Sequence, residues 1–266
     1  IVRRLVGSEM CIRDRSEINK PKQYQLILNN QMLLTQTLNR CVSKIFKKPI
    51  ISTNIKHKPF IGEINNNQYD KVIFEKNGKN TAASILLACL LENNRDAIML
   101  VLPSDHYIPD IDYFNSIIEK AAVHLNQFNI ITFGIKPTYA ATQYGYIHTL
   151  NNSEIAPVES FYEKPSLSDA TGMFDTGEYL WNSGMFLFRV TTLMEQVKKI
   201  DADLYNKLLR IASSLDKDSA EIIVNSNIWS KLKSISFDVA IMEKIAGIGC
   251  YRYEKYWSDL GDWKRI

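Results

Sequence analysis

The 266-residue sequence has little cysteine, proline or glycine and almost no net charge. Its four cysteines form no CxxC pair and have no neighbouring histidine at metal-ligand spacing, which excludes a disulfide scaffold and favours a reduced, cytosolic setting. Lys+Arg 32 against Asp+Glu 29 leaves +3, too near balance to indicate nucleic acid as a partner. No apolar run approaches the roughly 20 residues that span a bilayer. We therefore expect a cytoplasmic protein with no membrane partner, and the sequence leaves a homo-oligomer open.

The composition that remains is that of an ordinary globular protein. Hydrophobic residues make up 45% and charged residues 23%, enough apolar mass for a substantial core. No GxGxxG motif follows any expected strand, which argues against a dinucleotide-binding dehydrogenase.

The first fifteen residues differ in composition from the rest of the chain. They hold four of the ten arginines, whereas the other 251 residues use 22 lysines and six arginines. Four arginines against Glu9 and Asp14 supply +2 of the net +3. The string LVGSEMCIRDR resembles a translated sequencing adapter, so we predict that residues 1–15 are a non-native scar and leave them out of the fold assignment. The alternative is a genuine basic N-terminus.

From residue 26 onward, short apolar runs alternate with helical patterns, which predicts an α/β fold with a mixed, mainly parallel sheet flanked by helices. The segment after Gly134 reads as strands separated by polar loops, so part of the sheet is expected to be antiparallel. The expected strands are 49–53, 71–75, 97–102, 129–134, 250–253 and the runs YGYIHTL, VESFYEKP and YLWNSGMFLFRV. The expected helices are 32–46, 80–92, 113–125, 192–199, 203–213 and 239–246.

Two aspartates are candidates for holding a cation. AIMLVLPSDH is an apolar strand that ends in a turn and delivers Asp105 to the loop where ligands of α/β sheets bind, and a carboxylate there suits Mg²⁺. Asp259, in WSDLGDW near the chain end, is the second candidate. Each could equally be a turn or capping residue, and spacing alone does not pair them.

Other polar residues interrupt apolar segments. Asn80 and Thr81 precede the apolar helix, where they could cap it or leave N–H groups for an anion or a base edge. Glu163 and Lys164 in FYEKP could bind a hydroxyl and a phosphate, or form only a solvated turn. Asn182 in WNSGMF and the glycine of YGY, Gly145, indicate a bulge or the close approach of a ligand.

These motifs together resemble a known family. VLPSDH, FGIKPTYAATQYGYI, FYEKP, YLWNSGMFLFR, SFDVAIMEK and WSDLGDW are similar, in this order, to the motifs of bacterial mannose-1-phosphate guanylyltransferases, and the similarity runs from about Lys20 to Trp263. EKNGKNTAA looks like the EPxxRNTAP element of that family, so the resemblance favours guanine and implies substrate contacts at Glu75, Asn80 and Thr81.

The resemblance implies a Rossmann-like nucleotidyltransferase that joins GTP and mannose 1-phosphate into GDP-mannose, a precursor for polysaccharide biosynthesis, and releases pyrophosphate. Asp105 and Asp259 would then hold Mg²⁺, and Lys22 would contact phosphate. Gly145, Glu163 and Asn182 would surround the mannose, with Lys164 on its phosphate. No nucleophilic side chain is required, because the sugar phosphate is itself the attacking group.

Several departures from the family pattern carry expectations of their own. The glycine-rich phosphate loop that should precede Lys22 has no counterpart, so we expect a poorly folded first strand and little or no activity in this chain. The sequence ends soon after WSDLGDW, so residues 16–266 are expected to be an incomplete nucleotidyltransferase domain. Lys76, Lys79, Ala83 and Gln143 replace the family's Pro, Arg, Pro and Gly.

Two alternatives stay open at this stage. One is a pyrophosphorylase for another sugar 1-phosphate, which would prefer a pyrimidine nucleotide. The other is a catalytically silent subunit that binds a nucleotide sugar, although retention of both Asp105 and Asp259 argues against it.

Overall fold

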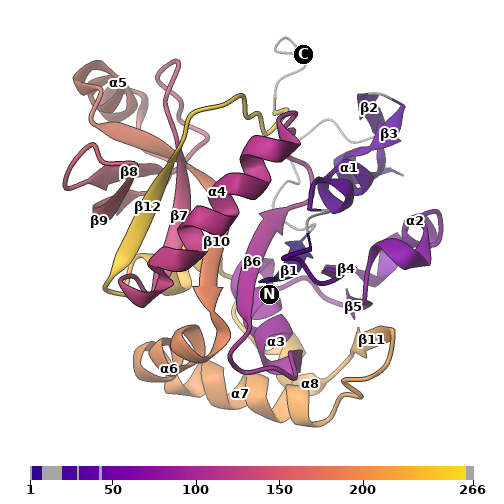
Figure 1. The fold of residues 1–266 in the computed structure, drawn as a ribbon. Helices are drawn as coiled ribbons and strands as arrows, with labels where there is room; N and C mark the ends of the chain where they lie inside the picture. The colour runs from indigo at the N-terminus through magenta and orange to yellow at the C-terminus, as the bar shows by residue number, and fades with distance from the viewer. Residues whose placement is uncertain (1, 8–19, 29, 42–43, 262–266) are drawn as a thin grey trace.

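The structure is a computed structural model that describes residues 2–7, 20–28, 30–41 and 44–261. Within these ranges, one large mixed sheet runs through the molecule with helices on both faces (Figure 1). Its strand order is β11-β5-β4-β1-β6-β10-β7-β12-β9-β8, and β8 also pairs with β10. The strands from β11 to β6 and the pair β7–β12 are parallel, whereas β10, β9 and β8 pair antiparallel with their neighbours.

The strands alternate with helices along most of the chain, as the sequence predicts. The strands are β1 (Val2–Gly7), β4 (Ile50–Asn54), β5 (Lys71–Glu75), β6 (Ile98–Pro103), β7 (Ile130–Ile135), β8 (Tyr146–Thr149), β9 (Ile155–Tyr162), β10 (Tyr179–Arg189), β11 (Glu221–Val224) and β12 (Ile248–Tyr253), with the short pair β2 (Leu26–Leu28) and β3 (Gln31–Met32) beside the large sheet. The helices are α1 (Leu33–Arg40), α2 (Lys58–Ile61), α3 (Asn80–Leu91), α4 (Ile111–Val123), α5 (Leu167–Thr176), α6 (Val190–Ile200), α7 (Ala202–Ser213) and α8 (Asn227–Ser230).

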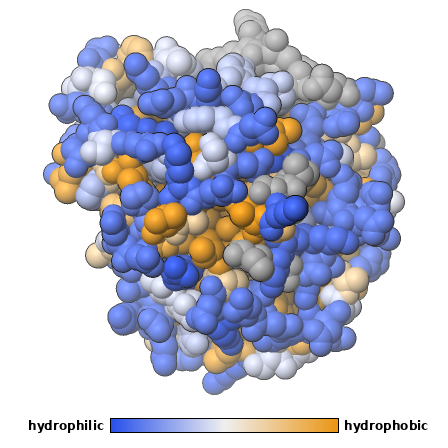
Figure 2. All heavy atoms as spheres, in the orientation of Figure 1, coloured by the Kyte–Doolittle hydropathy of each residue, from blue (hydrophilic) through white to orange (hydrophobic). Residues whose placement is uncertain are grey.

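Each face of the sheet buries its own apolar cluster. Helix α3, apolar nearly all round, lies with α6 and α7 on one face, where its residues from Ala82 to Leu91 are all buried. Helices α1 and α4 cover the other face through Leu34, Leu38, Phe114 and Ile118. In the view of Figure 2, hydrophilic residues dominate this face of the molecule, and a group of apolar ones lies near its centre.

The first strand lies within the segment that the sequence analysis leaves out of the fold. Residues Val2–Gly7 form β1, which pairs parallel with both β4 and β6, and Val2, Leu5 and Val6 are buried. These six residues therefore belong to the centre of the sheet. The scar assignment for residues 1–15 and the expectation of a poorly folded first strand stay predictions.

Two expected helices differ from the structure. The helix expected over 32–46 ends at Arg40, because the chain leaves it to pair with the first strand: Val2 N–H donates to the Ile45 carbonyl at 2.6 Å. The segment expected as helix 239–246 is a short π-helix, Asp238–Met242. The pattern also missed α5 and β11, whose apolar residues are few or alternate with exposed ones.

Loops that follow strands of the sheet carry several of the candidate residues. Asp105 follows β6 and Asp259 follows β12, while Glu163 and Lys164 follow β9. No helix in the described part of the chain is both long and apolar enough to cross a membrane.

Candidate active site

The loop after β6 holds Asp105 in a buried position. Asp105 is only 5% exposed, although a lone carboxylate is costly to bury. The buried guanidinium of Arg40 in α1 donates through Nη2 to the His106 carbonyl at 2.7 Å and so ties this loop to the helix. Burial lowers the pKa of Arg40 to about 10, so the side chain stays charged at neutral pH.

Backbone pairing brings the distant loop that carries Asp259 beside Asp105. Tyr107 N–H donates to the Ser258 carbonyl at 2.8 Å, and Ser258 N–H donates to the Tyr107 carbonyl at 3.1 Å. The Trp257 indole N–H also donates to His106 Nδ1 at 3.2 Å. The loops that carry these two aspartates, 154 positions apart in the sequence, therefore lie side by side.

The ammonium of Lys22 joins the two aspartates into what we call the Asp105 cluster (Lys22, Asp105 and Asp259). Lys22 Nζ lies 3.1 Å from Asp105 Oδ2 and also donates to the backbone carbonyl of Asp259. Lys22 begins a short 3₁₀ turn, Lys22–Tyr24, that is anchored by the buried Tyr24. The Lys22 ammonium thus lies against the Asp105 carboxylate and against the backbone of Asp259.

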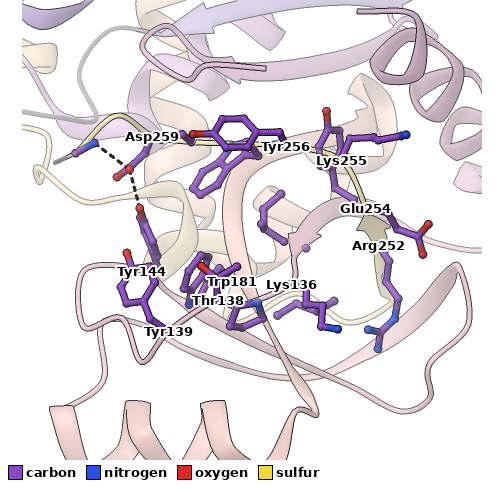
Figure 3. A pocket seen from close by; sticks show the side chains of 18 residues that line it. Lys136, Thr138, Tyr139, Tyr144, Trp181, Arg252, Glu254, Lys255, Tyr256 and Asp259 are labelled. Atoms are coloured by element: carbon purple, nitrogen blue, oxygen red, sulfur yellow. Dashed lines mark hydrogen bonds between the residues drawn. The ribbon is translucent and has the colours of Figure 1, made fainter. Parts of the chain in front are cut away.

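Tyr144 sets the orientation of the Asp259 carboxylate. Its hydroxyl donates to Asp259 Oδ1 at 2.6 Å, and the Gly261 N–H donates to the same oxygen at 3.0 Å (Figure 3). Burial, and then the charge of Asp259, raises the pKa of Tyr144 above its usual range, so the phenol keeps its proton. Among the described residues, Asp259 Oδ2 accepts no hydrogen bond.

His106 is neutral in this site. Burial lowers its pKa more strongly than Asp105 and Asp259 raise it. Because Nδ1 accepts from Trp257, the assigned tautomer carries the proton on Nε2, 4.0 Å from Asp105 Oδ1. His106 therefore adds a polar N–H beside Asp105 without adding a charge.

A second group of residues, the Asn182 cluster (Gly145, Glu163, Lys164, Asn182 and Asp238), adjoins the first through Tyr144 and Gly145. Asn182 N–H donates to the Gly145 carbonyl at 2.8 Å. A Cβ on Gly145 would lie 2.9 Å from Glu163 Oε2 and 3.6 Å from Asn182 Cβ, so a side chain here would displace the carboxylate. Lys164 Nζ pairs with Glu163 Oε1 at 2.6 Å.

Asp238 completes this cluster from the π-helix. Asn182 Nδ2 donates to Asp238 Oδ1 at 2.7 Å, and the Gly184 N–H donates to Asn182 Oδ1 at 3.1 Å. Burial, followed by the nearby negative charge of Glu163, raises the pKa of Asp238 to about 6. Polar groups at an irregular helix are frequent at functional sites.

The residues expected to contact the nucleotide divide into two kinds. Glu75 is fully buried, and its Oε1 accepts hydrogen bonds from the hydroxyls of Ser52, at 2.9 Å, and Ser84, so it links β4, β5 and α3. Asn80 is exposed at the start of α3 with φ 61°, and its side chain accepts from the Thr81 N–H at 2.8 Å. The Thr81 hydroxyl accepts from the Phe237 N–H at 2.8 Å, next to Asp238.

The structure thus brings together most of the residues that the sequence singled out. Lys22, Asp105 and Asp259 form one cluster and Gly145, Glu163, Lys164 and Asn182 another, whereas the buried Glu75 lies in the protein interior. A direct substrate contact at Glu75, Asn80 or Thr81 stays a prediction. Sequence reasoning missed Arg40, Tyr144 and Asp238. Asp238 stands in the family motif SFDVAIMEK, directly before the helix expected at 239–246, and Tyr144 stands in YGY, but neither motif gives the residue a role.

A cavity of about 860 Å³ lies beside the Asp105 cluster. Tyr144, Trp181, Tyr256 and Asp259 line it, and in Figure 3 Lys136, Arg252 and Lys255 lie at its other end. Neither Asp105 nor Asn182 is among its lining residues. The cavity therefore borders the site at Asp259 and does not contain it.

The donor set of the Asp105 cluster fits a hard divalent cation. In the described ranges, no group of three or more His, Cys, Asp or Glu side chains could hold a metal. Proteins nevertheless commonly bind Mg²⁺ through one or two carboxylates, and water and phosphate oxygens complete its coordination shell. Asp105 and Asp259 therefore fit a cation shared with a phosphate ligand better than a closed structural site.

Curated proteins resemble this chain over nearly its whole length. Mannose-1-phosphate guanylyltransferase of Sinorhizobium fredii is 32% identical over 260 residues, which cover 94% of this chain and 51% of the relative. The enzyme of the same name from Escherichia coli is 31% identical and is matched over 57% of its length. The chain thus spans about half the length of these curated relatives.

Solved structures share the fold. A Helicobacter pylori protein described as mannose-6-phosphate isomerase superposes with a TM-score of 0.83 at 25% identity, over 97% of this chain and 99% of that one. A Thermus thermophilus protein described as mannose-1-phosphate geranyltransferase gives 0.85 at 22% identity, over 100% and 77%. The predicted mixed α/β nucleotide-sugar transferase fold is confirmed. Residues 18–266 match the family described as nucleotidyl transferase, so the chain is a member of the nucleotidyl transferase family.

Proposed function

We propose that this chain carries the site for transfer of a guanylyl group from GTP to mannose 1-phosphate, which gives GDP-mannose and pyrophosphate. The observation that carries the proposal is the meeting of Lys22, Asp105 and Asp259 directly beside the Asn182 cluster. One side offers charges suited to phosphates, and the other offers the Glu163 carboxylate and the Asn182 amide, which suit sugar hydroxyls.

In this reaction the protein mainly positions the two substrates and neutralises the charge of their phosphates. A phosphate oxygen of the sugar 1-phosphate attacks the α-phosphorus of GTP in line, the bond from that phosphorus to the pyrophosphate oxygen breaks, and pyrophosphate leaves. Lys22, held between Asp105 and the Asp259 backbone, binds a phosphate oxygen and offsets charge that builds up during transfer. Tyr144 keeps the Asp259 carboxylate in one orientation.

Asp105 and Asp259 would hold Mg²⁺. When bound, the ion supplies Lewis-acid polarisation of the phosphate oxygens and a template for both reactants. The protein's own part is to hold the two carboxylates on adjacent loops. Asp105 stays paired with the Lys22 ammonium, and the neutral His106 adds no positive charge that would compete for the ion.

The sugar would lie against the Asn182 cluster. Gly145 lets the Glu163 carboxylate lie close to the backbone, because a Cβ at this position would come within 2.9 Å of Glu163 Oε2. Glu163 accepts hydrogen bonds from sugar hydroxyls, and Asn182 donates a hydrogen bond to one of them. Lys164, which is half-exposed beside Glu163, reaches the sugar phosphate. The names of the relatives at 31–32% identity support mannose as the sugar and guanine as the base.

A binding panel tests the proposal most simply. Titration calorimetry with Mg²⁺ would compare GDP-mannose, UDP-glucose and dTDP-glucose, and we expect GDP-mannose to bind at least about tenfold more tightly, a difference of roughly 1.4 kcal/mol. A preference for either pyrimidine nucleotide would contradict the guanylyl assignment. Binding of GDP-mannose that is unchanged without Mg²⁺, and that goes with no turnover, would indicate a silent binding subunit.

Turnover is a second readout. We expect GDP-mannose formation well below that of a longer relative such as the Escherichia coli enzyme, because a single ammonium cannot replace the backbone N–H groups of a glycine-rich phosphate loop. A rate near that of the relative would contradict this expectation and leave the assigned reaction standing.

A further inference from the structure

Asp238 is a polar residue of the site to which the proposed reaction assigns no role. It begins the π-helix Asp238–Met242 and is half-buried beneath β10. The preceding N–H, that of Phe237, is held by the Thr81 hydroxyl at the start of α3, so the backbone position of Asp238 is tied to a second element. The carboxylate therefore has a defined place beside Asn182.

The hydrogen bonds of Asn182 determine which of its groups a ligand can use. Its Oδ1 accepts from the Gly184 N–H at 3.1 Å and lies 3.2 Å from the Thr132 hydroxyl. Its Nδ2 donates to Asp238 Oδ1 at 2.7 Å. A backbone N–H can only donate and an ionised carboxylate can only accept, so the amide has a single orientation. Within the described residues, its second N–H has no partner, and Asn182 can meet a ligand only as a donor.

Asp238 keeps accepting capacity of its own. Asn182 and its own backbone N–H use part of the roughly four lone-pair positions of a carboxylate. Among the charged groups around it, Glu163 acts against its ionisation and Lys164 in favour of it. A half-buried carboxylate next to another carboxylate costs free energy unless a donor compensates it.

We propose that Asp238 is a further sugar-binding residue, whose carboxylate accepts a hydroxyl of the sugar while the neighbouring Asn182 N–H donates to an adjacent oxygen. The two side chains form a donor and acceptor pair along one edge of the ring, opposite Glu163. This inference rests on the proposed function, because it places the sugar of a nucleotide sugar in the Asn182 cluster.

The test compares GDP-mannose with GDP on the wild-type chain and on Asp238→Asn. The asparagine carbonyl can still accept from Asn182, so the orientation of Asn182 is kept and only the ionised acceptor is lost. A hydrogen bond to a charged group corresponds to about a ten- to hundredfold change in affinity. We expect calorimetry to show that loss for GDP-mannose, with less than about twofold change for GDP.

Glu243→Gln is the matched control. Glu243 is exposed and directly follows the same π-helix. Its substitution by glutamine removes the same charge and should leave the affinities for GDP-mannose and GDP unchanged. A GDP-mannose affinity unaltered by Asp238→Asn would overturn the inference, and so would an equal loss for GDP and GDP-mannose, which indicates a purely structural role. A wild-type chain that binds neither ligand would instead contradict the proposed function, and this inference with it.

Discussion

At the scale of single residues, one hydroxyl holds a carboxylate in place. Tyr144 donates to Asp259 Oδ1 and the Gly261 N–H shares that oxygen. A half-buried aspartate such as Asp259 would otherwise sample several rotamers, and fixing it on binding a cation would cost side-chain entropy. The position of Tyr144, directly before Gly145, also links cation binding to the Asn182 cluster.

Tyr144→Phe should therefore weaken the binding of a divalent cation without unfolding the chain. Loss of a hydrogen bond to a charged group predicts an affinity for Mn²⁺ about tenfold lower, corresponding to roughly 1.5 kcal/mol. Electron paramagnetic resonance of free Mn²⁺ measures this directly. Tyr256→Phe serves as the control, because Tyr256 lines the same cavity and, among the described residues, makes no hydrogen bond to Asp259. Equal Mn²⁺ affinity in the two variants would show that Tyr144 does not position Asp259.

The ionisation of Asp238 makes stability depend on pH. Its pKa is about 6 in the folded chain against 3.8 for the ordinary group, chiefly because of burial. Between these two pH values the folded state holds a proton that the unfolded state has released, so the free energy of unfolding falls as pH rises from about 4 to about 6. Above that range, the whole cost of the buried charge is present.

Asp238→Asn removes this cost. We expect the variant to be more stable than the wild type by about 1–2 kcal/mol near pH 7.5, and equal to it near pH 4. Urea unfolding at the two pH values measures the difference. A variant that is less stable near pH 7.5 would mean that the Asp238 carboxylate stabilises the fold. Its presence would then be explained without a ligand.

At the scale of helices and strands, local pattern predicts the buried elements well. The strand expected at 71–75 has the observed bounds of β5, and the helix expected at 80–92 is one residue longer than α3. β5 is buried along its whole length and α3 from Ala82 to Leu91, so both sequences are mostly apolar. Elements whose limits depend on partners are less predictable: α1 ends at Arg40 because residues 45–47 pair with β1, and no local breaker marks that point.

Close packing between strands predicts a strong effect at Gly134 in β7. A Cβ there would lie 2.6 Å from both Cys250 Sγ and Leu180 Cδ1, in β12 and β10. Gly134→Ala should lower the free energy of unfolding by about 1–3 kcal/mol through overpacking. Gly172→Ala in the exposed α5, where a Cβ meets nothing within 4 Å, should raise it by up to about 1 kcal/mol. Urea denaturation of both variants checks the contrast, and a neutral Gly134→Ala would contradict the packing of β7 against β10 and β12.

At the scale of the whole molecule, a chain of contacts joins the site from one end to the other. The Thr81 hydroxyl holds the Phe237 N–H, Asp238 holds Asn182, Asn182 bonds to Gly145, and Tyr144 holds Asp259 beside Lys22 and Asp105. The ordered family motifs predicted those residues of this series of contacts to which the resemblance gives a role. They could not predict Tyr144 and Asp238, because their roles arise from contacts across 115 and 56 positions and not from local spacing.

The central claim is that Asp105 and Asp259 bind one divalent cation together. The most direct measurement is Mn²⁺ affinity, by electron paramagnetic resonance with GDP-mannose present, for the wild type, Asp105→Asn, Asp259→Asn and the double variant. We predict that the Mn²⁺ affinity falls at least about tenfold in each single variant and falls little further in the double variant, because both carboxylates bind the same ion. Single variants that bind Mn²⁺ like the wild type, or losses that multiply in the double variant as for independent sites, would contradict the account.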